Sequence, residues 1–112
     1  MLVIDNNKKT YKLRVELEIG GSDPDKPDSG SFVVELPIPE RDFVDEITEL
    51  QRGGKMLEVY RRVILGVEGI GPANGESYPP DVQLDIVLKD YRLGNAALKA
   101  YRADIAKAAS KN

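Results

Sequence analysis

Two stretches of alternating apolar residues constrain the fold of this chain more than any other feature. From residue 11 to residue 19 every odd position is apolar and every even position is charged, and a second run alternates from 31 to 38. Because successive side chains of a strand point to opposite faces, each run predicts a β-strand with one buried face. Pro37 has no N–H for a ladder, so the second strand ends there or lies at an edge. The apolar positions are Tyr11, Leu13, Val15, Leu17, Ile19, Phe32, Val34, Leu36 and Ile38.

The segment between the two runs, residues 20–30, contains no apolar side chain apart from its prolines. Glycine, serine, aspartate and proline favour turns and exposed loops. The sequence therefore predicts a β-hairpin over residues 9–39 with a mobile loop at 20–30. This loop is either a solvated connector or an arm that becomes ordered on a partner. Asp23, Asp25 and Asp28 lack the twelve-residue EF-hand pattern, so we predict no calcium site there.

Beyond residue 40 the apolar residues recur at the spacing of a helix face. A first amphipathic helix is expected over residues 41–51, because Gly53 and Gly54 follow it and stop it. A second helical face is expected to begin at Met56 and to continue as far as Val67. An ordered, glycine-rich loop over residues 66–80 follows.

Two further helices are expected before the end of the chain. Asp81 can cap a third helix that ends between residues 90 and 94, and Asn95 can begin a last one. The predicted class is therefore α+β, an N-terminal antiparallel β-hairpin followed by about four short α-helices. We predict one domain over residues 1–112, with the helical part at 40–109. The apolar stripe of the last helix consists of Leu98, Tyr101, Ile105 and Ala108.

Composition excludes several kinds of function. The chain contains no cysteine and no histidine, which excludes disulfides and thiolate chemistry and removes the commonest general base and metal ligand. Gly66, Gly69 and Gly71 match neither of the two common nucleotide-binding patterns. We predict a protein without a cofactor or a metal that is not an enzyme. Carboxylate chemistry remains an alternative, with Glu68, Glu76 and Asp81 as candidates.

Charge and hydropathy limit the partners. The net charge is −3, and no dense basic stripe is present to neutralise a phosphate backbone, so nucleic acid is not an expected partner. The apolar runs are only a few residues long, far below the roughly 20 that span a bilayer. Nothing near residue 1 has the pattern of a secretion signal. We expect no membrane association and a location in the cytoplasm.

From Val63 onward the chain contains the run Ile64-Leu65-Gly66-Val67-Glu68-Gly69-Ile70, then an Asn74-Gly75 turn, then Tyr78-Pro79 before a helix. This segment resembles the tail assembly chaperones of long-tailed bacteriophages. That family has two aliphatic residues, then Gly-Trp-x-Gly and an aliphatic residue, a turn with glycine and a proline-containing start of a helix. It continues with paired leucines, a last helix with Ala-Tyr, and a basic end. The tryptophan position is occupied here by Val67, and the chain contains no tryptophan. The matching residues are Ile64, Leu65, Gly66, Glu68, Gly69, Ile70, Asn74, Gly75, Tyr78, Pro79, Leu84, Leu88, Leu98, Ala100, Tyr101, Lys111 and Asn112.

The resemblance implies a chaperone that binds the tape measure protein of a growing tail in the host cytoplasm and is absent from the mature virion. The family's matching motifs cluster around Val67, Ile70, Tyr78 and Tyr101, which makes these four the expected partner-binding residues. Family members also occur in a frameshifted longer form that recruits the tail tube protein, and this chain would be the short form. Homo-oligomers are a further expectation. The alternative function is a structural subunit for tail completion or for the head–tail connector, which would form a permanent ring.

Overall fold

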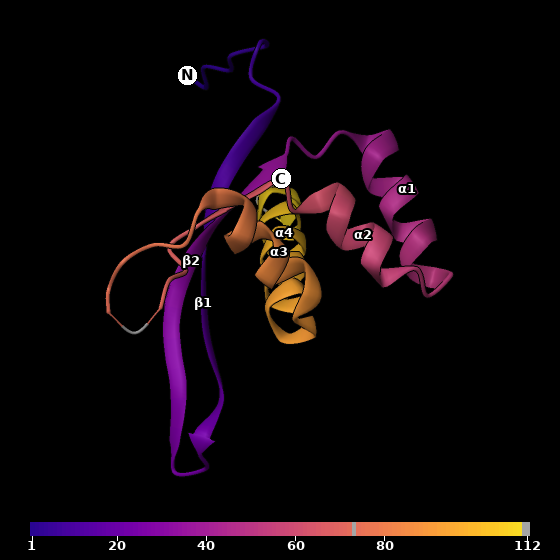
Figure 1. Ribbon diagram of the computed structural model, residues 1–112. Coiled ribbons are helices and arrows are strands. Elements are labelled where there is room, and N and C mark those ends of the chain that lie inside the picture. The colour runs from indigo at the N-terminus through magenta and orange to yellow at the C-terminus, as the bar shows by residue number, and fades with distance from the viewer. Residues whose placement is uncertain (73, 111–112) are drawn as a thin grey trace.

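A long β-hairpin and four helices make up the part of the chain that the computed structural model describes, residues 1–72 and 74–110. Figure 1 shows the hairpin on one side and the helices gathered on the other. The predicted α+β class, with an antiparallel hairpin before the helices, is confirmed. The strands are β1 (Thr10–Asp23), β2 (Lys26–Pro37) and β3 (Gly66–Glu68), and the helices are α1 (Arg41–Arg52), α2 (Met56–Val63), α3 (Pro80–Lys89) and α4 (Tyr91–Ser110).

The hairpin is longer than its apolar pattern predicts. β1 and β2 pair in an unbroken antiparallel register from Thr10 opposite Pro37 to Ile19 opposite Asp28. After an irregularity the pairing resumes with Asp23 opposite Lys26, so only residues 24 and 25 form the turn. The prediction of a loop over residues 20–30 is therefore wrong for most of that segment. We call residues 20–30 the arm, and Figure 1 shows it extending beyond the helices.

Backbone pairing, rather than side-chain burial, builds the arm. A β ladder requires only N–H and C=O groups, which glycine and serine supply as well as valine does. At the tip, the N–H of Asp25 donates to the Asp23 carboxylate at 3.0 Å. A side chain on Gly21 would meet the Lys26 carbonyl at 3.0 Å, so glycine permits the close approach of the two strands there. The apolar pattern that marks the rest of the hairpin has no counterpart in this segment.

The predicted second helical face does not reach Val67. Helix α2 ends at Val63, Ile64 is extended, and Val67 lies in β3, opposite Val34 of β2. The N–H of Leu65 donates to the Glu35 carbonyl at 2.9 Å, which starts this pairing. A short β-branched run fits a strand as well as a helix, and the open edge of β2 decides in favour of the strand.

The last two helices begin at other residues than the sequence predicts. Pro79 is the N-cap of α3, and Asp81 lies within its first turn. Helix α4 begins at Tyr91 rather than Asn95, because the Asp90 carboxylate accepts a hydrogen bond from the Arg92 N–H at 3.0 Å and so caps this helix.

Glycine inside α4 has a packing role. A side chain on Gly94 would meet the ring of Tyr60 at 3.0–3.2 Å. Tyr60 is a buried residue of α2, and its hydroxyl donates a hydrogen bond to the Asn95 side chain. Gly94 therefore lets α2 and α4 approach closely, despite the low helix propensity of glycine.

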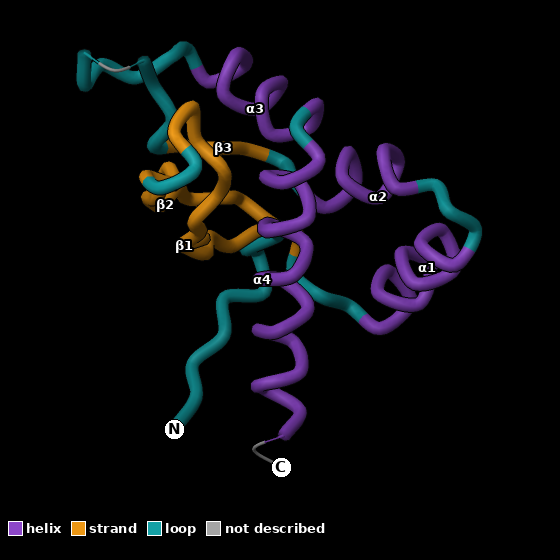
Figure 2. The backbone as a smooth tube through the Cα atoms, turned by 90° about the horizontal axis from the view of Figure 1, so that it is seen from below, coloured by secondary structure: helices purple, strands orange, loops and turns teal. Residues whose placement is uncertain are grey.

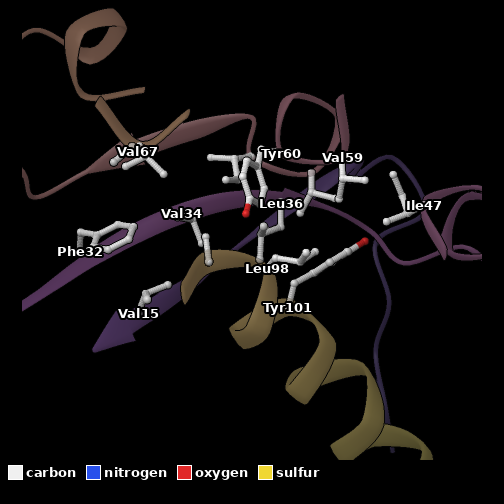
Figure 3. Packing of buried hydrophobic residues seen from close by; sticks show 14 residues of the cluster. Val15, Phe32, Val34, Leu36, Ile47, Val59, Tyr60, Val67, Leu98 and Tyr101 are labelled. Carbon is white, nitrogen blue, oxygen red and sulfur yellow. The ribbon is translucent and has the colours of Figure 1, made fainter. Parts of the chain in front are cut away.

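The core lies between one face of the sheet and the helices. Figure 2 shows the three strands as one layer, with the helices on one side of it. Figure 3 shows Val15 of β1 and Phe32, Val34 and Leu36 of β2 facing the helices. The buried residues form one cluster to which all four helices contribute. The cluster consists of Val15, Phe32, Val34, Leu36, Ile47, Val59, Tyr60, Val63, Ile64, Val67, Val87, Ala97, Leu98 and Tyr101.

Candidate functional site

Two of the four predicted partner-binding residues belong to the core. Val67 is 4% exposed and Tyr101 is 1% exposed. The Tyr101 hydroxyl donates to the Pro37 carbonyl at 2.9 Å, which ties α4 to the end of β2. In this conformation neither side chain is available to a partner, so their predicted role as contacts is corrected to a role in packing. On the stripe of α4, Leu98 is buried with Tyr101, Ile105 is half-buried and Ala108 is exposed.

The other two, Ile70 and Tyr78, lie half-buried at the two ends of the loop between β3 and α3. The N–H of Tyr78 donates to the Ile70 carbonyl at 3.1 Å, which closes the loop at its base. The structure brings these two residues together, and their role as contacts stays a prediction.

Gln83 of α3 holds the base of this loop. The Ile70 N–H donates to Gln83 Oε1 at 2.9 Å, and Gln83 Nε2 donates to the Tyr78 carbonyl at 2.7 Å. The residue is only 5% exposed, so both backbone groups would otherwise be shielded from water without a partner. Sequence reasoning missed Gln83. The available signal was its position one turn before Val87, on the buried face of α3.

A groove of about 390 Å³ lies between the hairpin and the loop that follows β3, and we call it the arm groove. Its volume falls within the roughly 300–1,000 Å³ typical of clefts that bind ligands. Gly69, whose φ is +97°, directly follows the last residue of β3 that pairs with β2, and it lines the groove. The groove is lined by Leu17, Ile19, Asp28, Ser29, Gly30, Ser31, Phe32, Gly69, Ile70, Gly71 and Leu93.

Apolar side chains from three separate segments meet in the arm groove. Leu17 and Ile19 come from β1, Ile70 from the loop and Leu93 from the first turn of α4. Leu17, Ile70 and Leu93 also pack against the buried cluster, whereas Ile19 lines the groove without such packing. A substitution at Ile19 therefore changes the groove with little effect on the core. Sequence reasoning assigned Leu17 and Ile19 only to the buried face of a strand.

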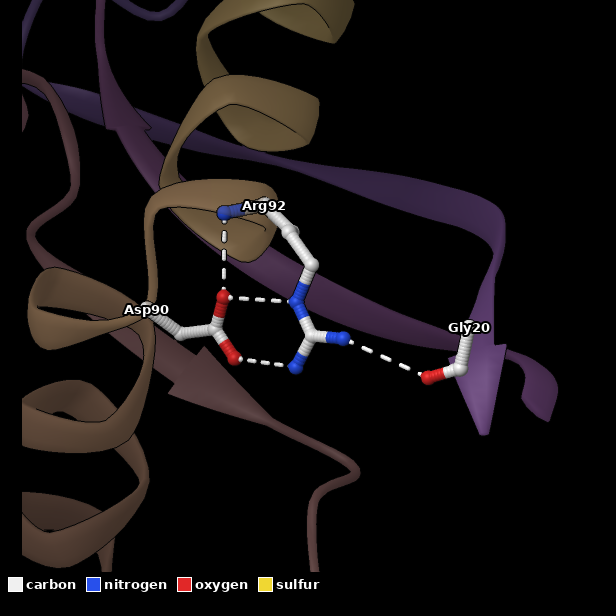
Figure 4. A network of polar contacts seen from close by, with 3 residues as sticks. All are labelled: Gly20, Asp90 and Arg92. Atoms are coloured by element: carbon white, nitrogen blue, oxygen red, sulfur yellow. Dashed lines mark hydrogen bonds and ion pairs between the residues drawn. The ribbon is translucent and has the colours of Figure 1, made fainter. Parts of the chain in front are cut away.

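Arg92 connects the groove wall to the hairpin, as Figure 4 shows. Its guanidinium donates to both carboxylate oxygens of Asp90, at 3.1 and 2.8 Å, and to the Gly20 carbonyl of β1 at 3.4 Å. The hydrogen bonds from the Arg92 side chain lower the pKa of the Asp90 carboxyl below its usual range. The contact joins the start of α4 to the point where the arm begins.

The three acidic candidates for chemistry are exposed residues at separate elements. Glu68 of β3 accepts a hydrogen bond from Lys12 at 2.6 Å, and Asp81 lies in the first turn of α3, where a carboxylate suits the helix dipole. Glu76 lies in the loop, where its N–H donates to the Asn74 side chain. Each of the three therefore has a local structural role, and the three do not form one site. Among the described residues no group of His, Cys, Asp and Glu could hold a metal ion.

The fold and the groove define a small α+β protein with a partly apolar groove between its β-hairpin and the loop that follows β3. No family model, no curated protein and no solved structure matches this chain. Within residues 1–72 and 74–110, no helix is long and apolar enough to cross a membrane.

Proposed function

We propose that the protein is a non-enzymatic tail assembly chaperone that binds and solubilises the tape measure protein of a long-tailed bacteriophage in the host cytoplasm. The observation that carries this proposal is the arm groove. Ile70, which lines it, belongs to the same glycine-containing segment that resembles the chaperone family. The family that the chain resembles also has two amphipathic strands and a short acidic helix before this segment, and β1, β2 and α1 precede it here.

The groove suits an amphipathic helix as its occupant. A long helical protein exposes apolar stripes in water, and a small protein can cover such a stripe by taking its side chains into a groove. The polar rim of the groove, formed by Asp28, Ser29 and Ser31, can face the polar flank of the same helix. No bond is made or broken in this function.

Coexpression with the tape measure protein tests the proposal. The wild-type chain should raise the soluble fraction of the tape measure protein, and Ile19→Asp and Ile70→Asp should abolish that effect. Leu57→Asp is the matched control, because Leu57 is 48% exposed on α2 and lies outside the arm groove. Circular dichroism of each variant separates loss of binding from loss of folding.

Two results would contradict the proposal. Equal solubilisation by the wild type and by both groove variants would exclude the arm groove as the binding surface. No solubilisation by the wild type would contradict the chaperone function itself. Detection of the protein in purified particles would favour the alternative, a subunit for tail completion or for the head–tail connector.

The proposal includes the family's longer form, made by frameshifting, which would recruit the tail tube protein. The dipeptide Lys111-Asn112 is compatible with a slippery codon pair. These two residues lie outside the part of the chain that the structure describes.

A further inference from the structure

The outer edge of β1 carries backbone groups that pair with no other strand in the described part of the chain. The strand order is β1-β2-β3, so β1 has β2 on one side only. The Lys9 carbonyl accepts from the Ile38 N–H, which places the odd-numbered backbone groups toward β2. Alternate residues of a strand face opposite edges, so residues 12, 14, 16 and 18 direct their N–H and C=O groups outward.

This edge carries charged side chains, which usually oppose pairing between proteins, but it has no proline, glycine or bulge that would block a second strand. Residues 11–19 contain no proline and no glycine, and their register with β2 is unbroken. The irregularity in the hairpin comes only after Ile19. A long, regular edge strand is a template for adding another strand.

The charged side chains of this edge are complementary to themselves. The exposed face of β1 reads Lys12, Arg14, Glu16, Glu18, two cations followed by two anions. A two-fold axis through Val15 would place a second β1 antiparallel to the first. Arg14 would then lie opposite Glu16 of the second copy, and Lys12 opposite Glu18. Opposite charges in directly facing positions stabilise a strand pair.

The same two-fold axis also brings apolar side chains together on the other face of the sheet and allows backbone hydrogen bonds between the two copies. It places Leu13 opposite Leu17 of the second copy, so apolar side chains meet on the face that carries the core. Residues 14 and 16 both direct their backbone groups outward, as a hydrogen-bonded antiparallel pair requires. The Gly20 carbonyl already accepts from Arg92, which limits the pairing to residues before the arm.

Glu16 and Glu18 have no cationic partner among the described residues of their own chain. Their neighbours on β2 are Ser31 and Ser29. Arg14, by contrast, donates to the Ser31 hydroxyl at 3.1 Å. The two glutamates therefore form an exposed, uncompensated negative pair beside an open strand edge.

We propose that two copies of this chain associate through the outer edges of their β1 strands, antiparallel and related by a two-fold axis at Val15. The two three-stranded sheets then form one continuous sheet with the helices of both copies on the same side. This proposal does not depend on the chaperone function.

Charge reversal tests the pairing. Sedimentation velocity of the full chain should show a dimer. Arg14→Glu and Glu16→Arg should each raise the dissociation constant of this dimer about tenfold or more, because the two pairs that join position 14 of one copy to position 16 of the other become repulsive. The double variant Arg14→Glu/Glu16→Arg should dimerise as the wild type does, because the axis pairs position 14 with position 16. Lys55→Glu, an exposed change outside β1, should have no effect.

Mixing the two single variants provides the decisive measurement. One variant carries two glutamates at positions 14 and 16, and the other carries two arginines, so the mixture should form a heterodimer although neither variant dimerises well alone. Circular dichroism checks that each variant is folded. A monomeric wild type, a dimer unaffected by either reversal, or a mixture without heterodimer would each overturn the proposal.

Discussion

At the scale of single residues, Gln83 holds the backbone of Ile70, one of the residues that line the arm groove. Its side chain accepts from the Ile70 N–H and donates to the Tyr78 carbonyl, and both bonds are partly buried. Gln83→Leu should leave a backbone N–H and a C=O unsatisfied and lower the free energy of unfolding by about 1–3 kcal/mol. Urea unfolding measures this change. Gln51→Leu, at an exposed glutamine, should stay within about 0.5 kcal/mol of the wild type, and equal effects of the two changes would contradict the role of Gln83.

Ionisation of Tyr101 should lower the free energy of unfolding at alkaline pH. Burial raises the pKa of Tyr101 from its ordinary value of 10.0 to about 12. The unfolded chain therefore loses this proton first, so the free energy of unfolding is unaffected below pH 10 and falls as the pH rises toward about 12. Tyr60, whose pKa burial also raises to about 12, acts in the same direction.

Urea unfolding at several pH values checks this prediction. Tyr101→Phe should lower stability at neutral pH, because the hydrogen bond to Pro37 is lost, and should reduce the loss of stability between pH 10 and about 12. Tyr78→Phe, which removes a tyrosine hydroxyl outside the buried cluster, serves as the control. An alkaline loss of the same size in wild type and Tyr101→Phe would show that Tyr101 is not responsible.

At the scale of elements, the side of the hairpin that faces the helices contributes to the stability of the fold through its buried side chains. Val15 lies in the middle of β1 and is 2% exposed. Val15→Asp should destabilise the fold by about 3–5 kcal/mol, because it buries an unpaired charge. Thermal unfolding measures the effect, with Glu18→Asp as the control that places aspartate on the exposed face of the same strand. An unchanged melting temperature for Val15→Asp would contradict the observed packing.

The elements that sequence analysis predicts well are those with a continuous apolar period. The alternation over residues 11–19 predicts most of β1, and the alternation over 31–38 predicts the C-terminal half of β2. The expected helix over 41–51 differs from α1 by one residue at its end. The arm could not be predicted in this way, since small polar residues pair through their backbones and leave no periodic signal. The start of α4 was also missed, because the Asp90 cap lies next to the end of α3.

At the scale of the whole molecule, the candidate site combines segments that are distant in sequence. Ile70 could be selected from its motif, but the groove also requires Ile19 and Leu93, which only the tertiary fold brings near it. The same limitation explains why Val67 and Tyr101 were predicted as contacts. A motif marks residues that matter, and their burial shows whether they pack internally or face a partner.

The buried cluster also predicts how the molecule unfolds. Because the sheet and all four helices contribute to one cluster, the chain should unfold in a single cooperative transition. Near-ultraviolet circular dichroism, which reports on tyrosine packing, and the far-ultraviolet signal should follow the same urea curve. Two separated transitions would show that the hairpin and the helices unfold as independent units, and would contradict the prediction of one domain.

The contact between Gly94 and Tyr60 links the choice of amino acid at two positions. As long as an aromatic ring occupies position 60, a β-carbon at position 94 lies only 3.0–3.2 Å from the ring and requires the ring to shift, although alanine would favour the helix by about 1 kcal/mol. Once a smaller side chain replaces the ring, that restriction disappears and alanine becomes the better residue at 94. Positions 60 and 94 should therefore covary among descendants of this sequence: a large side chain at 60 with glycine at 94, and a small side chain at 60 with alanine at 94. A change at one position alters which changes are tolerated at the other.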